Sequence, residues 1–590
     1  MINVNKASLT AVVLGLQLLG AVPAGEAGQV TWFAVDPMGE MPCLPDRAPE
    51  GGREGAPVQM VAARGEYEPC SFVLVADEDI GKVRLEISDL KQVKVKGEGE
   101  GREPGAVFPK EKLDLKTVKV WYQAGNAWRS YFADSGLVLC PELLLNDEDL
   151  VKVDMEKRHN YARITETDGR VHYQWLTAPK DVDNRVEYMG GAYNVRESFS
   201  CMKPNFRDAK THQGATLKKG EYKQFFITAN VTKDTPAGLY RGEVKVKGEG
   251  EQWNVPLVLK VLDFELPTPK CYFDTTKDFD TFFCEYINLD IIATLNGGDM
   301  KLAERQLGAI CRDFVRHNET LPNYRDNVTR PEIGREAGMT DFWKVFMGSE
   351  KLGEKAEMRY DARRQHEKLK KAFGDHRFLL SFGDEYGAEI LKGIREMAKV
   401  YHDEGFRFAM NSNFGYTLGH YFADLWWPPG NPDGQNADRA RKFNQLGGDG
   451  QLGWYACHHV GVENPAFNRR QYGFGPYRAG LSCNFNYAHH LSGWNDRGTQ
   501  YRSMMFVYGS GDGCIDTIQW EGFREGIDDI RYATLLKQLA DPLAKSADTE
   551  RRYAAKKALF LLAEADGDDM DLTTLRLEMI RHIQRLMALK

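Results

Sequence analysis

The chain lacks clustered cations, and it has no apolar run long enough to cross a membrane. Its 77 Lys and Arg residues are outnumbered by 85 Asp and Glu residues, which gives a formal net charge of -8. The cations are spread along the chain rather than gathered in a stripe. Because affinity for a nucleic-acid backbone needs clustered cations, we expect no nucleic-acid partner. We also expect no insertion into a membrane.

Several motifs of known enzyme classes are missing as well. The sequence has no Gly-x-Ser-x-Gly nucleophile elbow, no phosphate-binding P-loop and no dinucleotide fingerprint. The ten cysteines form no Cys-x-x-Cys pair, and several lie in apolar runs that are typical of buried thiols. The pairs His458-His459 and His489-His490 lack the i, i+4 spacing of a helical zinc site. We therefore expect no metal site and no cofactor.

The N-terminus has the pattern of a signal peptide over residues 1–27. Lys6 precedes the apolar segment Ala11–Val22, and small residues follow it up to Ala27. This apolar segment is too short to span a bilayer, and no cysteine stands at the cleavage position after Ala27 or Ala24. We expect an exported protein, periplasmic or extracellular. The sequence leaves its oligomeric state open.

A chain of 590 residues is too long for one hydrophobic core, so we expect several domains. Residues 28–267 contain short β-branched and aromatic runs, such as Ser71–Ala76 and Val83–Ile87, separated by Gly, Asp and Pro. This pattern predicts an all-β sandwich. The segment Leu266-Pro-Thr-Pro269 breaks the pattern and marks a domain boundary.

Beyond that boundary, short apolar runs alternate with helical segments. Residues 268–530 therefore predict an α/β domain of the (β/α)8-barrel type, with residues 531–590 as C-terminal helices packed on it. The expected helices include Ala303–His317, Ala388–His402 and Thr573–Leu589, and the expected strands include Arg377–Phe382, Phe406–Asn411, Leu452–Cys457, Gly480–Asn486 and Cys514–Trp520.

Two adjacent carboxylates, Asp384 and Glu385, follow the apolar strand that begins at Arg377. In a barrel the active site lies at the carboxyl ends of the strands. Glycosidases need a proton donor for the leaving oxygen and a negative group beside the oxocarbenium-like transition state. Gly383 lets the chain bend, so that both side chains can reach one sugar. The alternative is that Asp384 caps the following helix and Glu385 is an acid of its first turn.

Polar and aromatic side chains recur at other expected strand ends. Aromatic faces match the apolar faces of sugar rings, and aromatic residues make up 11% of the chain. Their recurrence predicts a sugar-sized cleft. The expected substrate-binding residues are Asn413, Trp454, Tyr455, Asn486, Tyr487, Trp494, Trp520 and Glu521.

At these residues the sequence resembles glycoside hydrolase family 123, the β-N-acetylgalactosaminidases, and a wider group of related barrel proteins. The resemblance covers most of the chain and is carried by Ala63-Arg-Gly-Glu-Tyr-Glu-Pro69, Asp234–Gly242, Gly383-Asp-Glu-Tyr386, Trp454-Tyr-Ala-Cys-His458 and Gln519–Asp529.

The resemblance implies substrate-assisted catalysis, in which the 2-acetamido oxygen of the substrate attacks the anomeric carbon and forms an oxazolinium intermediate. Asp384 would orient the acetamido group, and Glu385 would protonate the leaving oxygen and then activate water. Ala488 and Gln519 depart from the family pattern, which affects the sugar more than the chemistry. Two alternatives stay open: a glycosidase with a protein carboxylate as nucleophile, and a non-catalytic carbohydrate-binding protein.

Overall fold

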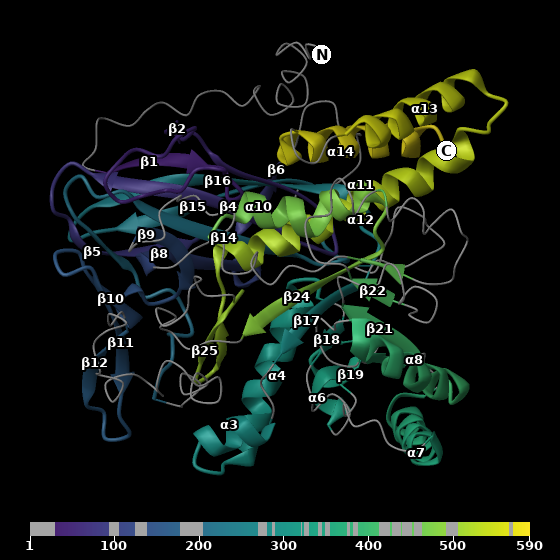
Figure 1. Cartoon of the computed structure of the whole chain (residues 1–590). Helices are drawn as coiled ribbons and strands as arrows, with labels where there is room; N and C mark the ends of the chain where they lie inside the picture. Colours follow the sequence, from purple (N-terminus) through teal and green to yellow (C-terminus); the bar gives the residue numbers. More distant parts are fainter. Residues whose placement is uncertain are drawn as a thin grey trace.

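The structure is a computed structural model (Figure 1). It describes residues 30–93, 105–123, 138–176, 205–268, 280–285, 289–319, 321–323, 330–339, 345–347, 355–374, 378–381, 388–411, 425–427, 438, 451–453, 463–490, 505–565 and 570–590. The proposed signal peptide lies outside the described residues. No helix within the described ranges is both long and apolar enough to cross a membrane.

The N-terminal part is a sandwich of two sheets. One sheet has the order β2 (Arg53–Glu54), β1 (Val30–Val35), β4 (Glu66–Ala76), β14 (Lys223–Val231), β8 (Leu113–Gln123), β9 (Val138–Leu145). The other has the order β13 (Ala215–Leu217), β5 (Gly81–Ile87), β15 (Gly238–Lys247), β16 (Gln252–Glu265), β3 (Val58–Arg64), with β6 (Leu90–Val93) beside β15 and β7 (Val107–Phe108) beside β6. All pairs are antiparallel except β16 with β3.

Both sheets contribute to one apolar core, because alternate residues of a strand point to the same face. Phe72 and Ile227 come from the first sheet, and Val244 and Leu257 from the second; all four are fully buried. The predicted sandwich is confirmed. A small third sheet of β10 (Val151–Asp154), β11 (His159–Thr165) and β12 (Val171–Trp175) extends from it at the left of Figure 1.

The second part contains parallel strands alternating with helices. β18 (Leu321–Asn323), β17 (Asp280–Glu285) and β24 (Cys483–His490) form one sheet, and β19 (Val345–Met347), β20 (Leu379–Ser381), β21 (Arg407–Asn411), β22 (Leu425–Trp427) and β23 (Gln451–Leu452) form another. Neighbours follow the order of the sequence, except that β24 pairs with β17. The described residues thus form part of a curled parallel sheet.

Helices connect these strands in the order α3 (Leu289–Leu295), α4 (Met300–Arg316), α6 (Pro331–Glu336), α7 (Lys355–Phe373), α8 (Ala388–Asp403), α10 (Pro465–Arg469), the π-helical turn η7 (Arg470–Phe474) and α11 (Gly475–Ala479). The predicted helices at Ala303–His317 and Ala388–His402 are confirmed as α4 and α8. In α4 the Asp299 side chain caps the first turn by accepting from the Leu302 N–H.

The chain ends in a hairpin, β25 (Tyr508–Ser510) and β26 (Gly513–Ile515), followed by α12 (Ile518–Leu543), α13 (Thr549–Glu564) and α14 (Leu572–Ala588). The predicted helix at Thr573–Leu589 is confirmed as α14. The predicted strand Cys514–Trp520 is wrong beyond Ile515, because the buried side chain of Thr517 accepts from the Trp520 N–H and starts α12 there.

Helix α12 lies at the centre of the molecule. It contacts β4 and β9 of the sandwich, α10 and η7 of the second part, and α13 and α14 (Figure 1). Trp520, Phe523, Ile527 and Ile530 of this helix are fully buried and belong to the same apolar core as α4 and α14. The C-terminal helices therefore pack on both the parallel-strand part and the sandwich.

Candidate functional site

The expected catalytic pair follows β20, a strand inside the five-stranded parallel sheet. β19 and β21 flank β20 on either side, and α8 begins at Ala388. Asp384 and Glu385 fall in the connection 382–387, which lies outside the described residues. Ligands of parallel α/β sheets bind at the carboxyl ends of the strands. The connection 382–387 starts at the carboxyl end of β20. The catalytic role of the pair stays a prediction.

Four of the eight expected substrate-binding residues also lie outside the described ranges. Asn413 follows β21, and Trp454, Tyr455 and Trp494 come after β23 or β24. Asn486 and Tyr487 belong to β24, where Asn486 pairs with Phe283 of β17. The structure describes the backbone of these two residues only. Their contacts with a sugar stay predictions.

Trp520 and Glu521 require a correction. They were expected at a strand end, but they occupy the first turn of α12 and are 0% and 2% exposed. The Trp520 indole N–H donates to Asp313 Oδ2 at 2.9 Å, and Glu521 contacts His317, Arg524 and Thr228. A buried side chain with protein partners does not contact a sugar in this conformation. The two residues join α12 to α4 and the sandwich instead.

A buried polar cluster surrounds these two residues at the C-terminal end of α4. Asp313 and His317 lie one turn apart, and the carboxylate Oδ1 of Asp313 is 2.9 Å from His317 Nδ1. His489 of β24 is 3.3 Å from Asp313 Oδ2, and Asp516 approaches from the residue before the cap of α12. One ligand atom each from Asp313, His317 and Asp516 lies within 4.8 Å of the others, which is close enough to hold a metal ion.

The electrostatics of this cluster are strongly perturbed. Burial opposes a charge on His317, but the Asp313 and Glu521 carboxylates outweigh it and raise its pKa to about 9. Burial would raise the pKa of Asp313, yet His317 and His489 hold it well below its usual range. Burial and the nearby Asp313 charge raise the pKa of Asp516 to about 7. Carboxyl groups with such different proton affinities are typical of functional or buried ionic sites.

Sequence reasoning missed this cluster because its members are distant in the chain. The only local signal is the i, i+4 spacing of Asp313 and His317, which places both side chains on one face of a helix. The adjacent histidine pairs are the more visible pattern in the sequence. Of these, His489 does reach the cluster, while the side chains of His458, His459 and His490 lie outside the described residues.

A second ionic cluster joins the C-terminal helices to the sandwich. The guanidinium of Arg576 on α14 lies between Asp529 (2.7 Å), Glu525 (2.6 Å) and Glu68 of β4 (3.3 Å). Arg469 of α10 donates two hydrogen bonds to Asp529 at 2.7 and 2.9 Å. Asp529 binds both cations, so the cluster connects α10, α12 and α14, and Arg576 joins it to β4 of the sandwich.

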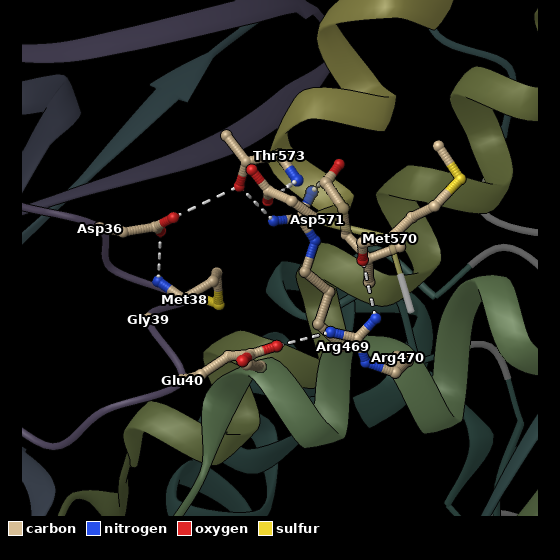
Figure 2. Close-up of a pocket in the computed structure, with 11 residues that line it drawn as sticks. Asp36, Met38, Gly39, Glu40, Arg469, Arg470, Met570, Asp571 and Thr573 are labelled. Atoms are coloured by element: carbon tan, nitrogen blue, oxygen red, sulfur yellow. Dashed lines mark hydrogen bonds and ion pairs between the residues drawn. The ribbon is translucent and has the colours of Figure 1, made fainter. Parts of the chain in front are cut away.

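A polar cavity of about 360 Å³ lies beside this second ionic cluster, and Arg469 belongs to both (Figure 2). Its lining comes from the segment after β1, from α10 and η7, and from the start of α14. At its rim Arg470 donates to Glu40 Oε1 and to the Met570 carbonyl, both at 2.9 Å, and Thr573 lies 3.5 Å from Asp36. Among the described residues that line this cavity there is no aromatic side chain, and none of them is a residue that we expect to bind substrate.

Comparison with known proteins gives a match at the level of the fold. No family model matches the sequence, and no curated protein matches it in sequence. Among solved structures, the chain is similar to a family 123 glycoside hydrolase from Clostridium perfringens that was studied for the hydrolysis of glycolipid glycans. The TM-score is 0.56 at 11% identity, over 89% of this chain and 93% of that one. This match confirms the resemblance to family 123 at the level of the fold.

Two further structures resemble parts of the chain. A GH10 xylanase with a bacterial Ig-like domain, from termite gut, has a TM-score of 0.28 at 10% identity, over 52% of this chain and 90% of that one. A putative β-galactosidase from Bacteroides fragilis has a TM-score of 0.27 at 9% identity, over 80% of this chain and 60% of that one. Scores this low support no inference about this chain.

Proposed function

We propose that the protein is an exported glycoside hydrolase that removes β-linked N-acetylhexosamine, with N-acetylgalactosamine as the preferred sugar. The observation that carries the proposal is the fold shared with the family 123 enzyme, which extends over both the sandwich and the parallel-strand part. Fold alone does not determine chemistry. The chemistry is argued from the acidic pair that follows β20.

In this proposal the parallel strands form a (β/α)8-type barrel. The pairing of β24 with β17 supports closure, because the last parallel strand then lies beside the first. Counted along the chain, β20 is the fourth of the described parallel strands, and Asp384 and Glu385 come directly after it. The active site would therefore lie at the carboxyl ends of the strands.

The two carboxylates have separate tasks. The acetamido oxygen of the substrate attacks the anomeric carbon as the glycosidic bond breaks, and the configuration is retained after water opens the oxazolinium ring. Asp384 accepts a hydrogen bond from the acetamido N–H and stabilises the positive charge that develops there. Glu385 gives its proton to the leaving oxygen and later takes one from the attacking water.

A panel of chromogenic β-GalNAc, β-GlcNAc and β-Gal glycosides tests the substrate class. We expect turnover of the two acetamido sugars, fastest for β-GalNAc, and none of β-Gal, because the nucleophile belongs to the acetamido group. A thiazoline mimic of the oxazoline is expected to inhibit strongly, since it resembles the intermediate.

Other outcomes of the panel would replace the proposal. Good turnover of β-Gal together with a trapped covalent glycosyl-enzyme would mean that a protein carboxylate is the nucleophile. Glycan binding without turnover across a broad panel would identify a non-catalytic carbohydrate-binding protein.

A further inference from the structure

Helix α13 presents two large aromatic side chains at the surface. Tyr553 and Phe560 are 58% and 61% exposed. They stand seven residues apart, which is about 10 Å along a helix, so they lie on one face. The other side of α13 carries Ala554, Ala555 and Ala558, which are buried in the core. The two aromatic rings therefore contribute little to the packing of the helix.

Cationic side chains lie between and beside these rings. Lys556 and Lys557 are both exposed and occupy the turns that separate Tyr553 from Phe560. Lys557 Nζ is 4.9 Å from the centre of the Tyr553 ring, a distance at which the ring attracts the ammonium group. The exposed carboxylates Glu550 and Glu564 stand at the two ends of this face. Its middle therefore combines aromatic and positively charged groups.

Helix α14 adds further cations to the same surface. It runs antiparallel to α13, since Glu550 at the start of α13 is 3.7 Å from Arg585 near the end of α14. Arg581, one turn before Arg585, pairs with Glu578. The two arginine side chains are 52% and 56% exposed. Because exposed ion pairs contribute little free energy, both guanidinium groups can exchange these carboxylates for an anionic ligand.

The environment of His582 shows that the positive charges converge. Burial and the charges of Arg581, Lys557 and Arg585 lower the pKa of this histidine. The chain as a whole has a net charge of -8, so this surface is opposite in sign to the molecule's average. The sequence separates these cations, and the packing of α13 on α14 brings them together (Figure 1).

This combination of side chains matches a particular class of partner. Anionic groups complement the lysines and arginines, and the apolar faces of sugar rings complement the exposed aromatic faces. A membrane surface would require a broad apolar face on the helix. The leucines of α13 instead pack against the core, namely Leu559, Leu561 and Leu562. The exposed apolar area is therefore better suited to single sugar rings than to lipid.

We propose that the outer surface of α13 and α14 binds a polyanionic polysaccharide, whose sugars carry sulfate or carboxylate groups. Tyr553 and Phe560 contact sugar rings, and Lys557, Arg581 and Arg585 bind the anionic groups. The choice of a polysaccharide rests on the proposed glycosidase function, because such a surface would hold a polymeric substrate on the enzyme. None of these residues belongs to the expected active site, so binding here is measured separately from turnover.

Binding to immobilised heparin, a sulfated polysaccharide, tests the surface. We expect the wild type to bind heparin and to lose affinity as salt is added, because salt screens exposed charges. Lys557→Glu combined with Arg585→Glu is expected to weaken binding at least about tenfold. Arg364→Glu combined with Lys368→Glu is the matched control, because it makes the same change of charge at exposed positions of α7. Its affinity is expected to equal that of the wild type.

The aromatic side chains are tested in the same way. Tyr553→Ala combined with Phe560→Ala is expected to weaken heparin binding about threefold or more, since each ring contacts a sugar. Tyr360→Ala on α7 is the control for the loss of an exposed ring, because Tyr360 is 69% exposed. Turnover of chromogenic monosaccharide substrates is expected to be unchanged in all these variants. Normal turnover without heparin binding contradicts this inference alone, and heparin binding without turnover contradicts the proposed function alone.

Other results would overturn the proposal. One is a folded wild-type protein that does not bind heparin at low salt. Another is an equal loss of affinity in the control pair on α7, which would mean a general attraction between charges. Unchanged affinity in Tyr553→Ala with Phe560→Ala would describe a surface that binds anions without contacting sugars. Binding to phosphatidylserine vesicles or to a second copy of the chain, in place of heparin, would assign the surface to that partner.

Discussion

At the scale of single residues, Glu66 links the stability of the molecule to pH. Its Oε2 accepts from the Ala63 N–H and the Tyr532 hydroxyl, both at 2.7 Å, in a position that is 1% exposed. Burial and the charge of Asp528 raise its pKa to about 8, although Arg576 opposes the shift. The folded protein therefore holds a proton on Glu66 at pH values where the unfolded chain has lost it.

The sign of the pH dependence follows from this difference. Between about pH 4.5 and pH 8 folding takes up a proton, so the free energy of unfolding falls as the pH rises, by at most about 1.4 kcal/mol per unit for this group. Glu66→Gln is expected to make the decline between pH 5 and pH 8 shallower in urea denaturation. The exposed Glu111→Gln is the control. If the free energy of unfolding of Glu66→Gln fell with pH as steeply as that of the wild type, the pH dependence would not come from Glu66.

At the scale of elements, α12 crosses α10 and η7 at unusually close range. A Cβ added at Gly522 would meet the Pro465 carbonyl oxygen at 2.4 Å, and one added at Gly526 would meet the Arg469 carbonyl oxygen at 2.5 Å. The two glycines are four residues apart, so they share one face of the helix. In this chain the two glycines of the segment Gln519–Asp529 allow α12 to pack closely against α10 and η7.

Gly526→Ala is expected to destabilise the protein by about 1–3 kcal/mol or more, because the backbones at the crossing must separate. Gly308→Ala on α4 is the matched control. Its Cβ would meet the nearest atom only at 3.5 Å, so the substitution is expected to be neutral or to stabilise by up to about 1 kcal/mol. Urea denaturation of both variants measures the difference. Equal losses in the free energy of unfolding for the two variants would contradict the close packing of α12 against α10 and η7.

Elements that lie in long periodic or apolar runs could be predicted from the sequence, and elements outside such runs could not. The helices α4, α8 and α14 and the strands β20 and β21 lie where apolar periodicity indicated them. The strands β19, β20 and β22 are all three residues long; β20 was predicted because it lies inside the longer apolar run Arg377–Phe382, while β19 and β22 lie in shorter runs. The β-branched run at Cys514–Trp520 indicated a strand, while Thr517 as a cap and Glu521 in the first turn were the overlooked signs of a helix.

At the scale of the whole molecule, Arg576 connects three layers: the sandwich, α12 and α14. Its side chain is 6% exposed and faces Glu68, Glu525 and Asp529. Arg576→Leu would leave these carboxylates without their shared cation, which is expected to cost about 3–5 kcal/mol. Arg581→Leu on the same helix removes an exposed pair with Glu578 and is expected to cost less than about 1 kcal/mol. Chemical denaturation compares the two variants.

The candidate sites differ in whether they could be predicted from the sequence. The acidic pair after β20 is local, so a strand pattern followed by Asp384 and Glu385 sufficed to single it out. Asp313, His317 and Asp516 meet only because α4 packs against the start of α12, and no local pattern encodes that contact. Trp520 and Glu521 were misassigned for the same reason: burial between layers depends on the packing of distant segments.

The rates of Asp384→Asn and Glu385→Gln on a chromogenic β-GalNAc substrate test the central claim most directly. Each substitution is expected to lower kcat by about 10²–10⁴-fold with an unchanged Tm, because each removes a group that acts in the transition state. Asp403→Asn and Glu404→Gln are matched controls, since this second Asp-Glu pair lies at the end of α8 and binds Arg359 and Arg363 on the surface. Wild-type rates in the first two variants, or equal losses in all four, would contradict the account.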